Sequence, residues 1–135
     1  YLDALKWAKS IGGLKALIAR ADANFAVLDK FTAEHGWLAN LAVDPGSRSN
    51  TSVCLSIVDP AVTALDADGQ AAFAKGIVSA LDKEGVAYDI GAYRDAPPGL
   101  RIWCGATVET ADLEALLPWL DWAFVQQKAT LKAAA

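Results

Sequence analysis

The chain has 135 residues, of which 54% are hydrophobic and 21% charged, and its formal net charge is -4. The length suits one compact domain, and the composition excludes intrinsic disorder. Because the net charge opposes phosphate attraction and no apolar run reaches the roughly 20 residues of a membrane-spanning helix, we expect neither a nucleic-acid partner nor a membrane segment.

The first quarter of the chain predicts two helices joined at a pair of glycines. Residues 2–11 carry apolar side chains at helical spacing, Gly12-Gly13 interrupts the pattern, and a longer helix follows to about Gly36. The first helix is already under way at Tyr1, and the chain contains no methionine. We therefore expect a fragment or a processed piece of a longer protein.

Two strands and a turn are predicted next. Residues 37–43 have the character of a strand, and the sequence Asp-Pro-Gly-Ser at 44–47 has the composition of a turn. In residues 51–58, valine, leucine and isoleucine alternate with serine and cysteine. This alternation predicts a strand with one buried face.

The segment that follows predicts one helix and two strands. Asp66 or Asp68 can cap the helix, and Gly85 is placed to end it in the left-handed conformation. Residues 88–93 and 100–104 have the character of strands.

A last helix is predicted from Thr110, which can cap it, and Pro118 within it is expected to bend it. The order of elements is then helix, helix, strand, strand, helix, strand, strand, helix. Short connections between consecutive strands favour antiparallel pairing. The predicted fold class is α+β, with a small, mostly antiparallel sheet and helices packed on one face.

Few side chains support catalysis or metal binding by spacing alone. His35, the only histidine, falls at the end of the long helix, where a capping or partly buried role fits better than a general base. Cys54 and Cys104 lack neighbouring ligands at metal spacing, and helix capping explains Asp66 and Asp68. We expect no metal, and two reduced core thiols in a cytoplasmic protein.

Arg101 has the clearest binding chemistry in the chain. Strand alternation places Arg101 and Trp103 on the face opposite to Leu100 and Ile102. An arginine can hold a planar carboxylate through two parallel hydrogen bonds, which a lysine cannot. Spacing alone favours an exposed arginine that lies over Trp103 or pairs with a local carboxylate.

Arg94 lies in the proline-rich connection between the last two predicted strands. It could supply a second positive group at the mouth of a pocket. An ordinary surface arginine is the simpler interpretation of the same residue.

Several stretches resemble a known family. Gly-Gly-Leu opens the long helix at 12–14, Arg-Ser-Asn-Thr-Ser-Val enters a strand at 48–53, and Gly-Leu-Arg-Ile-Trp precedes the last helix at 99–103. Together they resemble the C-terminal domain of class V, fold-type I aminotransferases. Three further segments look most like a bacterial branch of phosphoserine aminotransferases: 84–91, 107–113 and 119–124. The resemblance covers essentially the whole chain.

The resemblance implies a two-domain subunit. A large domain, absent from this chain, would hold pyridoxal phosphate on a Schiff-base lysine, and residues 1–135 would be the small domain that closes the substrate cleft. The match places the family's α-carboxylate arginine at Arg101. It places the phosphate-binding histidine-arginine pair at Tyr93-Arg94, where the tyrosine does not inherit the histidine's role. No catalytic or cofactor-binding residue is implied within this chain.

The implied reaction moves an amino group between glutamate and 3-phosphohydroxypyruvate in serine biosynthesis, in a homodimeric enzyme that acts on amino and keto acids. None of the lysines lies in a stretch that resembles the Schiff-base site, so the chain alone is expected to be inactive. Other interpretations are a different class V aminotransferase, a stand-alone small-acid-binding or regulatory module that uses Arg101, and an interaction domain. For the last, Trp7, Trp119 and Trp122 would mark the partner surface.

Overall fold

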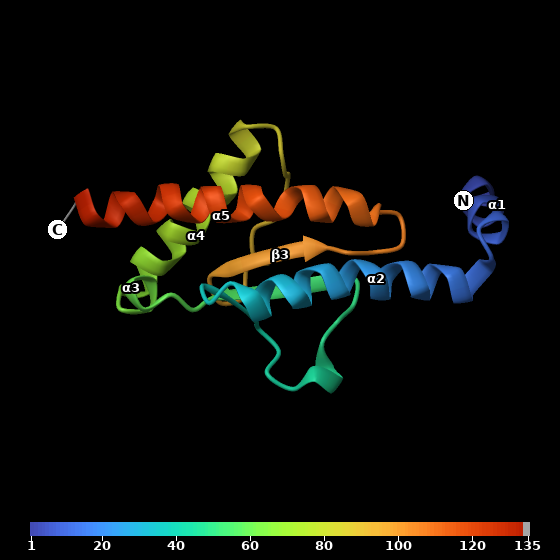
Figure 1. Ribbon diagram of the computed structural model, residues 1–135, viewed down its shortest axis with the longest axis horizontal. Helices are drawn as coiled ribbons and strands as arrows, with labels where there is room; N and C mark the ends of the chain where they lie inside the picture. Colours follow the sequence, from blue (N-terminus) through green and yellow to red (C-terminus); the bar gives the residue numbers. More distant parts are fainter. Residues whose placement is uncertain (134–135) are drawn as a thin grey trace.

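The computed structural model describes residues 1–133 (Figure 1). In chain order its elements are α1 (Leu2–Ser10), α2 (Gly13–Glu34), β1 (Leu38–Asn40), the short 3-10 helix η1 (Pro45–Ser47), β2 (Ser52–Ile57), α3 (Pro60–Thr63), α4 (Ala67–Lys83), β3 (Gly99–Trp103) and α5 (Thr110–Ala133). Strands therefore alternate with helices along the chain, and the longest helices lie near its two ends.

The three strands form one antiparallel sheet in the order β1-β2-β3. Leu38 of β1 lies opposite Ile57 of β2, and Ser52 of β2 lies opposite Trp103 of β3. Burial alternates along β2, as the sequence predicts. The predicted fold class is confirmed: this is a small antiparallel sheet with helices packed on one face.

The core lies between the buried face of the sheet and three helices. Leu28 of α2, Ile77 of α4 and Leu120 of α5 are completely enclosed. In Figure 1, α2 and α5 run along the length of the molecule and α4 crosses α5 at a steep angle. Each helix contributes one apolar stripe to this core, as amphipathic helices do on a sheet.

The opposite face of the sheet is not covered by any helix among residues 1–133. It presents Ser52 and Cys54 from β2 and Arg101 and Trp103 from β3. Trp103 is 56% exposed, and its ring lies so close to Gly105 that a side chain there would collide with it. The open face is therefore a surface of small side chains around one arginine and one tryptophan.

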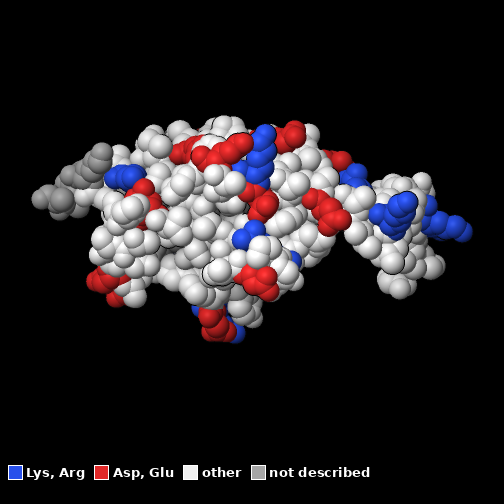
Figure 2. All heavy atoms as spheres, turned by 60° about the horizontal axis from the view of Figure 1, so that its bottom comes forward, with Lys and Arg blue, Asp and Glu red and all other residues white. Residues whose placement is uncertain are grey.

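The predicted glycine joint separates α1 from α2. Gly12 and Gly13 have φ values of 113° and 69°, in the left-handed region that glycine adopts most readily. The chain turns sharply there, and α1 projects from the body with no buried residue (Figure 1). On the face shown in Figure 2, basic side chains stand out on this projecting end, whereas acidic and basic groups alternate over the rest.

Residues 88–93, which we predicted to be a strand, do not form one. Asp89 has a φ of 54°, and this left-handed conformation interrupts an extended chain. Only Gly91 forms a bridge to β3, opposite Leu100, and the Ile90 carbonyl accepts a hydrogen bond from the Arg101 amide at 2.8 Å. The segment thus lies along the outer edge of β3 as an irregular cover.

The other boundaries differ less. β1 is shorter than predicted and ends at Asn40; beyond it the Leu41 amide still donates to the Cys54 carbonyl at 2.9 Å, and Arg48 Nε donates to the Ala42 carbonyl at 3.1 Å. The short α3 was not predicted, although Asp59 caps it and a proline follows, which is a helix-start signal. Asp66 is the cap of α4, as predicted. Gly85 adopts the predicted left-handed conformation after that helix, with φ 69°.

Candidate functional site

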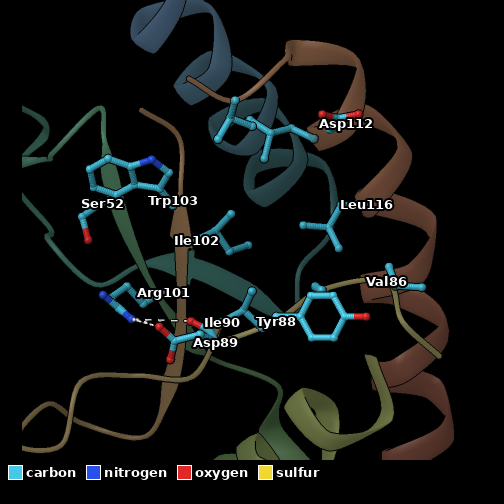
Figure 3. A pocket seen from close by; sticks show the side chains of 13 residues that line it. Ser52, Val86, Tyr88, Asp89, Ile90, Arg101, Ile102, Trp103, Asp112 and Leu116 are labelled. Carbon is cyan, nitrogen blue, oxygen red and sulfur yellow. Dashed lines mark hydrogen bonds and ion pairs between the residues drawn. The ribbon is translucent and has the colours of Figure 1, made fainter. Parts of the chain in front are cut away.

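A cavity of 470 Å³ opens at the outer edge of β3, the end strand of the sheet (Figure 3). Its walls come from residues 86–90, from β3 and from the first turns of α5. Apolar side chains, among them Ile102 and Leu116, form one side of it. Its polar groups are Ser52, Tyr88, Asp89, Arg101 and Asp112.

Arg101 is the one positively charged side chain among the described residues that line this cavity. Its Nη2 donates to Asp89 Oδ2 at 3.1 Å and to the Asp89 carbonyl at 3.5 Å, as Figure 3 shows. Its Nε is buried and has no hydrogen-bond partner within residues 1–133. A buried donor without a partner costs about 1–3 kcal/mol, so this guanidinium is only partly satisfied.

The strand holds Arg101 in place through its backbone. The Arg101 amide donates to the Ile90 carbonyl, and Arg101 lies opposite Cys54 of β2 in the ladder. The guanidinium therefore projects from a strand bonded on both sides, on the open face of the sheet. A site on a strand is held more rigidly than a site on a loop.

The loop that follows β3 is fixed by the buried side chain of Asn24 on α2. Asn24 Nδ2 lies 3.1 Å from the Cys104 carbonyl, 3.3 Å from that of Gly105 and 3.0 Å from that of Val108. Asn24 Oδ1 accepts a hydrogen bond from the Thr110 hydroxyl at 2.7 Å. Thr110, which we predicted as a cap, is the first residue of α5, so the hydrogen bond from its hydroxyl joins α5 to α2. Sequence reasoning missed Asn24, because an asparagine inside a helix gives no signal of what it contacts.

Arg94, the second predicted site residue, does not line the cavity of Arg101. Its side chain is 82% exposed, and its Nε lies 3.8 Å from Asp95 Oδ2. It lines a separate cavity of 280 Å³, between α4 and residues 91–99, together with Lys75. The structure therefore separates the two predicted arginines, and it places an unpredicted lysine beside Arg94's cavity.

His35 has the structural role that the sequence favours. It is the C-terminal cap of α2, where its Nδ1 lies 3.0 Å from the Phe31 carbonyl and its ring stacks on Phe31. Its Nε2 lies 3.1 Å from Asp121 Oδ2, and the other oxygen of that carboxylate accepts from Trp37 Nε1 at 2.7 Å. These contacts join α2, the residue before β1, and α5.

Residues 1–133, which the structure describes, hold neither a cluster of metal ligands nor a membrane-spanning helix. No three histidine, cysteine or acidic side chains there come together as a metal site. Among the same residues, no helix has the length and apolar character needed to cross a membrane. Cys54 and Cys104 are both free thiols.

Comparison with known proteins gives a consistent result. No family model matches the chain. The chain is 48% identical over 124 residues to phosphoserine aminotransferase of Methanosarcina barkeri (strain Fusaro / DSM 804), an alignment that covers 92% of this chain and 31% of the relative.

Two solved structures share the fold. Phosphoserine aminotransferase from Bacillus circulans subsp. alkalophilus superposes with a TM-score of 0.71 at 19% identity, over 90% of this chain and 30% of that chain. A phosphoserine aminotransferase structure that records radiation damage of its Schiff base gives a TM-score of 0.69 at 16% identity, with the same two coverages of 90% and 30%.

The chain matches the C-terminal part of phosphoserine aminotransferase.

Sequence and fold contribute differently to this match. The solved structures, at 16% and 19% identity, show the fold alone, whereas the 48% identity to the Methanosarcina barkeri phosphoserine aminotransferase extends over nearly the whole chain. The chain spans about a third, 31%, of the length of that relative. The resemblance noted in the sequence is therefore confirmed.

Proposed function

We propose that this chain is the small C-terminal domain of a phosphoserine aminotransferase and that Arg101 binds the α-carboxylate of the substrate. The whole enzyme would move an amino group between glutamate and 3-phosphohydroxypyruvate in serine biosynthesis. The observation that carries the role of Arg101 is its position: among the described residues its guanidinium is the one positive charge that lines the cavity, and it stands on a strand hydrogen-bonded on both sides. The 48% identity to a phosphoserine aminotransferase supports the choice of family.

Arg101 has the chemistry that this role needs. A guanidinium presents parallel N–H groups that match the two oxygens of a carboxylate, and each charge-assisted hydrogen bond is stronger than a neutral one. Both substrates of the proposed reaction carry a carboxylate next to the reacting carbon. A fixed arginine would therefore orient that carbon, and orientation of this kind accounts for a large share of many rate enhancements.

The residues that line the Arg101 cavity do not fit the covalent anchor of pyridoxal phosphate. A Schiff base needs a lysine amine, and no lysine is among the described residues that line the Arg101 cavity. Pyridoxal phosphate, when bound, supplies the electron sink for amino-group transfer. We propose that it is held by a large domain in the part of the relatives that this chain does not match, and that this chain alone is inactive.

Arg94 is proposed as a contact for the substrate phosphate. It is exposed, and Lys75 lines the same cavity, so two cations stand on one side of the domain. Completion of a phosphate site there would require the large domain or the second subunit of a homodimer. We also propose that the enzyme is cytoplasmic.

The test compares two conservative variants in the longer enzyme that contains this chain. Arg101→Lys is expected to raise KM for both glutamate and phosphoserine and to lower kcat/KM by roughly 10- to 100-fold, because charge-assisted hydrogen bonds contribute about 1.5–3 kcal/mol each. Arg94→Lys is expected to raise KM for phosphoserine and to leave KM for glutamate unchanged, because only phosphoserine carries the phosphate. Steady-state kinetics with each substrate varied in turn separates the two roles.

Other results would point elsewhere. Unchanged kinetics in Arg101→Lys would remove the carboxylate assignment. A longer protein that binds pyridoxal phosphate and is indifferent to phosphoserine would be a different class V aminotransferase. Amino-acid binding by the isolated chain, with no cofactor in the longer protein, would favour a stand-alone acid-binding module.

A further inference from the structure

Asp89 contacts the nitrogen of Arg101 that a bound carboxylate needs. A carboxylate can meet a guanidinium with two hydrogen bonds either through Nε and Nη2 or through Nη1 and Nη2. Nη2 takes part in both arrangements, and it is the atom that lies 3.1 Å from Asp89 Oδ2. The buried Nε is enclosed in the cavity wall, so the terminal nitrogens are the approachable ones.

The contact between Asp89 and Arg101 is of a kind that exchanges easily. The Asp89 side chain is 89% exposed and that of Arg101 34%, so water competes for the pair. Exposed ion pairs of this kind contribute little to stability. The hydrogen bond between the Arg101 amide and the Ile90 carbonyl holds the backbone beside Asp89, so the carboxylate can rotate away while the segment stays in place.

The backbone of Asp89 is set for this contact. Asp89 is the one non-glycine residue with positive φ among residues 1–133. Aspartate tolerates this conformation better than most side chains do. The left-handed residue bends the segment toward β3, where both its carboxylate and its carbonyl reach Arg101 Nη2 (Figure 3).

We infer that Asp89 is an internal carboxylate that occupies Arg101 when no ligand is bound and is displaced by the carboxylate of the ligand. Asp89 is thus a specificity-determining residue: an incoming anion must form better hydrogen bonds with Arg101 than Asp89 does. A planar carboxylate that forms two bonds meets this condition, and an ion such as chloride does not. The inference rests on the proposed role of Arg101 as a carboxylate anchor.

The test measures carboxylate binding at Arg101 directly. In the ¹⁵N-labelled 135-residue chain, the Arg101 Nε–Hε signal, assigned by its loss in Arg101→Lys, is followed while sodium acetate replaces sodium chloride at constant ionic strength. Asp89→Asn keeps the shape of the side chain and removes the competing charge. It is expected to lower the midpoint concentration of acetate by about two- to five-fold, the range that corresponds to an exposed ion pair.

Asp95→Asn is the matched control, because it removes the same charge from an exposed aspartate that pairs with Arg94. Its acetate midpoint should equal that of the unchanged chain. If Asp89→Asn perturbs the folded amide spectrum, Asp89→Gly replaces it, since glycine favours a φ of 54°.

The possible outcomes separate the two proposals. Equal or weaker acetate binding in the Asp89 variant, with a clear response in the unchanged chain, would overturn the competitor role and leave Arg101 as the anchor. An Arg101 signal that ignores acetate in every variant would remove the anchor and the competitor together. The inference requires tighter acetate binding in Asp89→Asn than in the unchanged chain, with no such change in Asp95→Asn.

Discussion

Cys104 and Cys54 lie in neighbouring strand segments and differ in their chemistry. Cys104, directly after β3, is completely buried, whereas Cys54 lies on the open face of the sheet and is partly exposed. Burial raises the pKa of the Cys104 thiol from 9.0 to about 12, because the thiolate is poorly solvated in the core. The reactive form of Cys104 is therefore scarce at neutral pH, and its carbonyl, not its thiol, is the group tied to Asn24.

This difference predicts selective labelling. In the folded chain at pH 8, Cys54 is expected to react with a thiol reagent and Cys104 to stay unmodified, because its thiol remains protonated until the pH approaches about 12. Mass spectrometry after labelling counts the modified thiols, and Cys54→Ala isolates Cys104. Labelling of Cys104 in that variant as fast as in denaturant would contradict its burial.

At the scale of elements, Asn24 joins α2 to the loop between β3 and α5. It is completely buried, and its amide and carbonyl groups make hydrogen bonds to four residues of that loop and of α5. Removal of the side chain would leave buried carbonyls without donors, which costs more than the loss of an exposed hydrogen bond.

We therefore predict that Asn24→Ala lowers the free energy of unfolding by about 2–4 kcal/mol. Asn50→Ala is the control, because its amide donates to Asp22 at the surface, and a change within about 0.5–1 kcal/mol is expected there. Urea denaturation of both variants gives the comparison. Equal losses of unfolding free energy in Asn24→Ala and Asn50→Ala would show that the buried hydrogen bonds of Asn24 stabilise the fold no more than a surface hydrogen bond does.

Local patterns predicted the elements that depend on local physics. The alternation in β2, the glycines before α2 and the cap at Asp66 each act within a few residues, and all three are found. The strand predicted at 88–93 is absent because Asp89 adopts a left-handed conformation, in which its carboxylate contacts Arg101 of β3, twelve residues further along the chain.

The candidate site was predictable only in part. The face on which Arg101 stands followed from strand alternation. Its contact with Asp89 and the bonds that Asn24 makes depend on tertiary pairing, which no local pattern encodes. Tertiary packing also decides that Arg94 and Arg101 line different cavities.

At the scale of the whole molecule, stability is unevenly distributed. α1 has no buried residue and projects from the body (Figure 1), whereas α4 and α5 bury Ile77, Leu81 and Leu120 completely. An exposed pair, Trp119 and Trp122, packs edge to face on α5 with ring centroids 5.5 Å apart. We propose that the large domain covers α1 and the exposed Trp119 and Trp122 pair.

Hydrogen exchange should reveal this distribution. Amides of residues 2–10 are expected to exchange through local opening, with protection lower by about 100-fold or more than that of α4 and α5. Exchange mass spectrometry on the folded chain measures both regions in one experiment. Equal protection of α1 and α4 would mean that α1 unfolds only with the whole domain.

The hydrogen bond from Asn24 to Cys104 joins residues 80 positions apart, and this has a consequence for biosynthesis. A ribosome that adds about 5–20 residues per second needs roughly 4 to 16 seconds to make the intervening stretch. During that interval α2 has left the peptidyl-transferase centre, but the residues whose carbonyls accept from the Asn24 side-chain amide have not yet been added. The nascent domain therefore cannot complete its fold from the N-terminus onward. Until the segment after β3 is made, the apolar face of α2 stays exposed and accessible to chaperones.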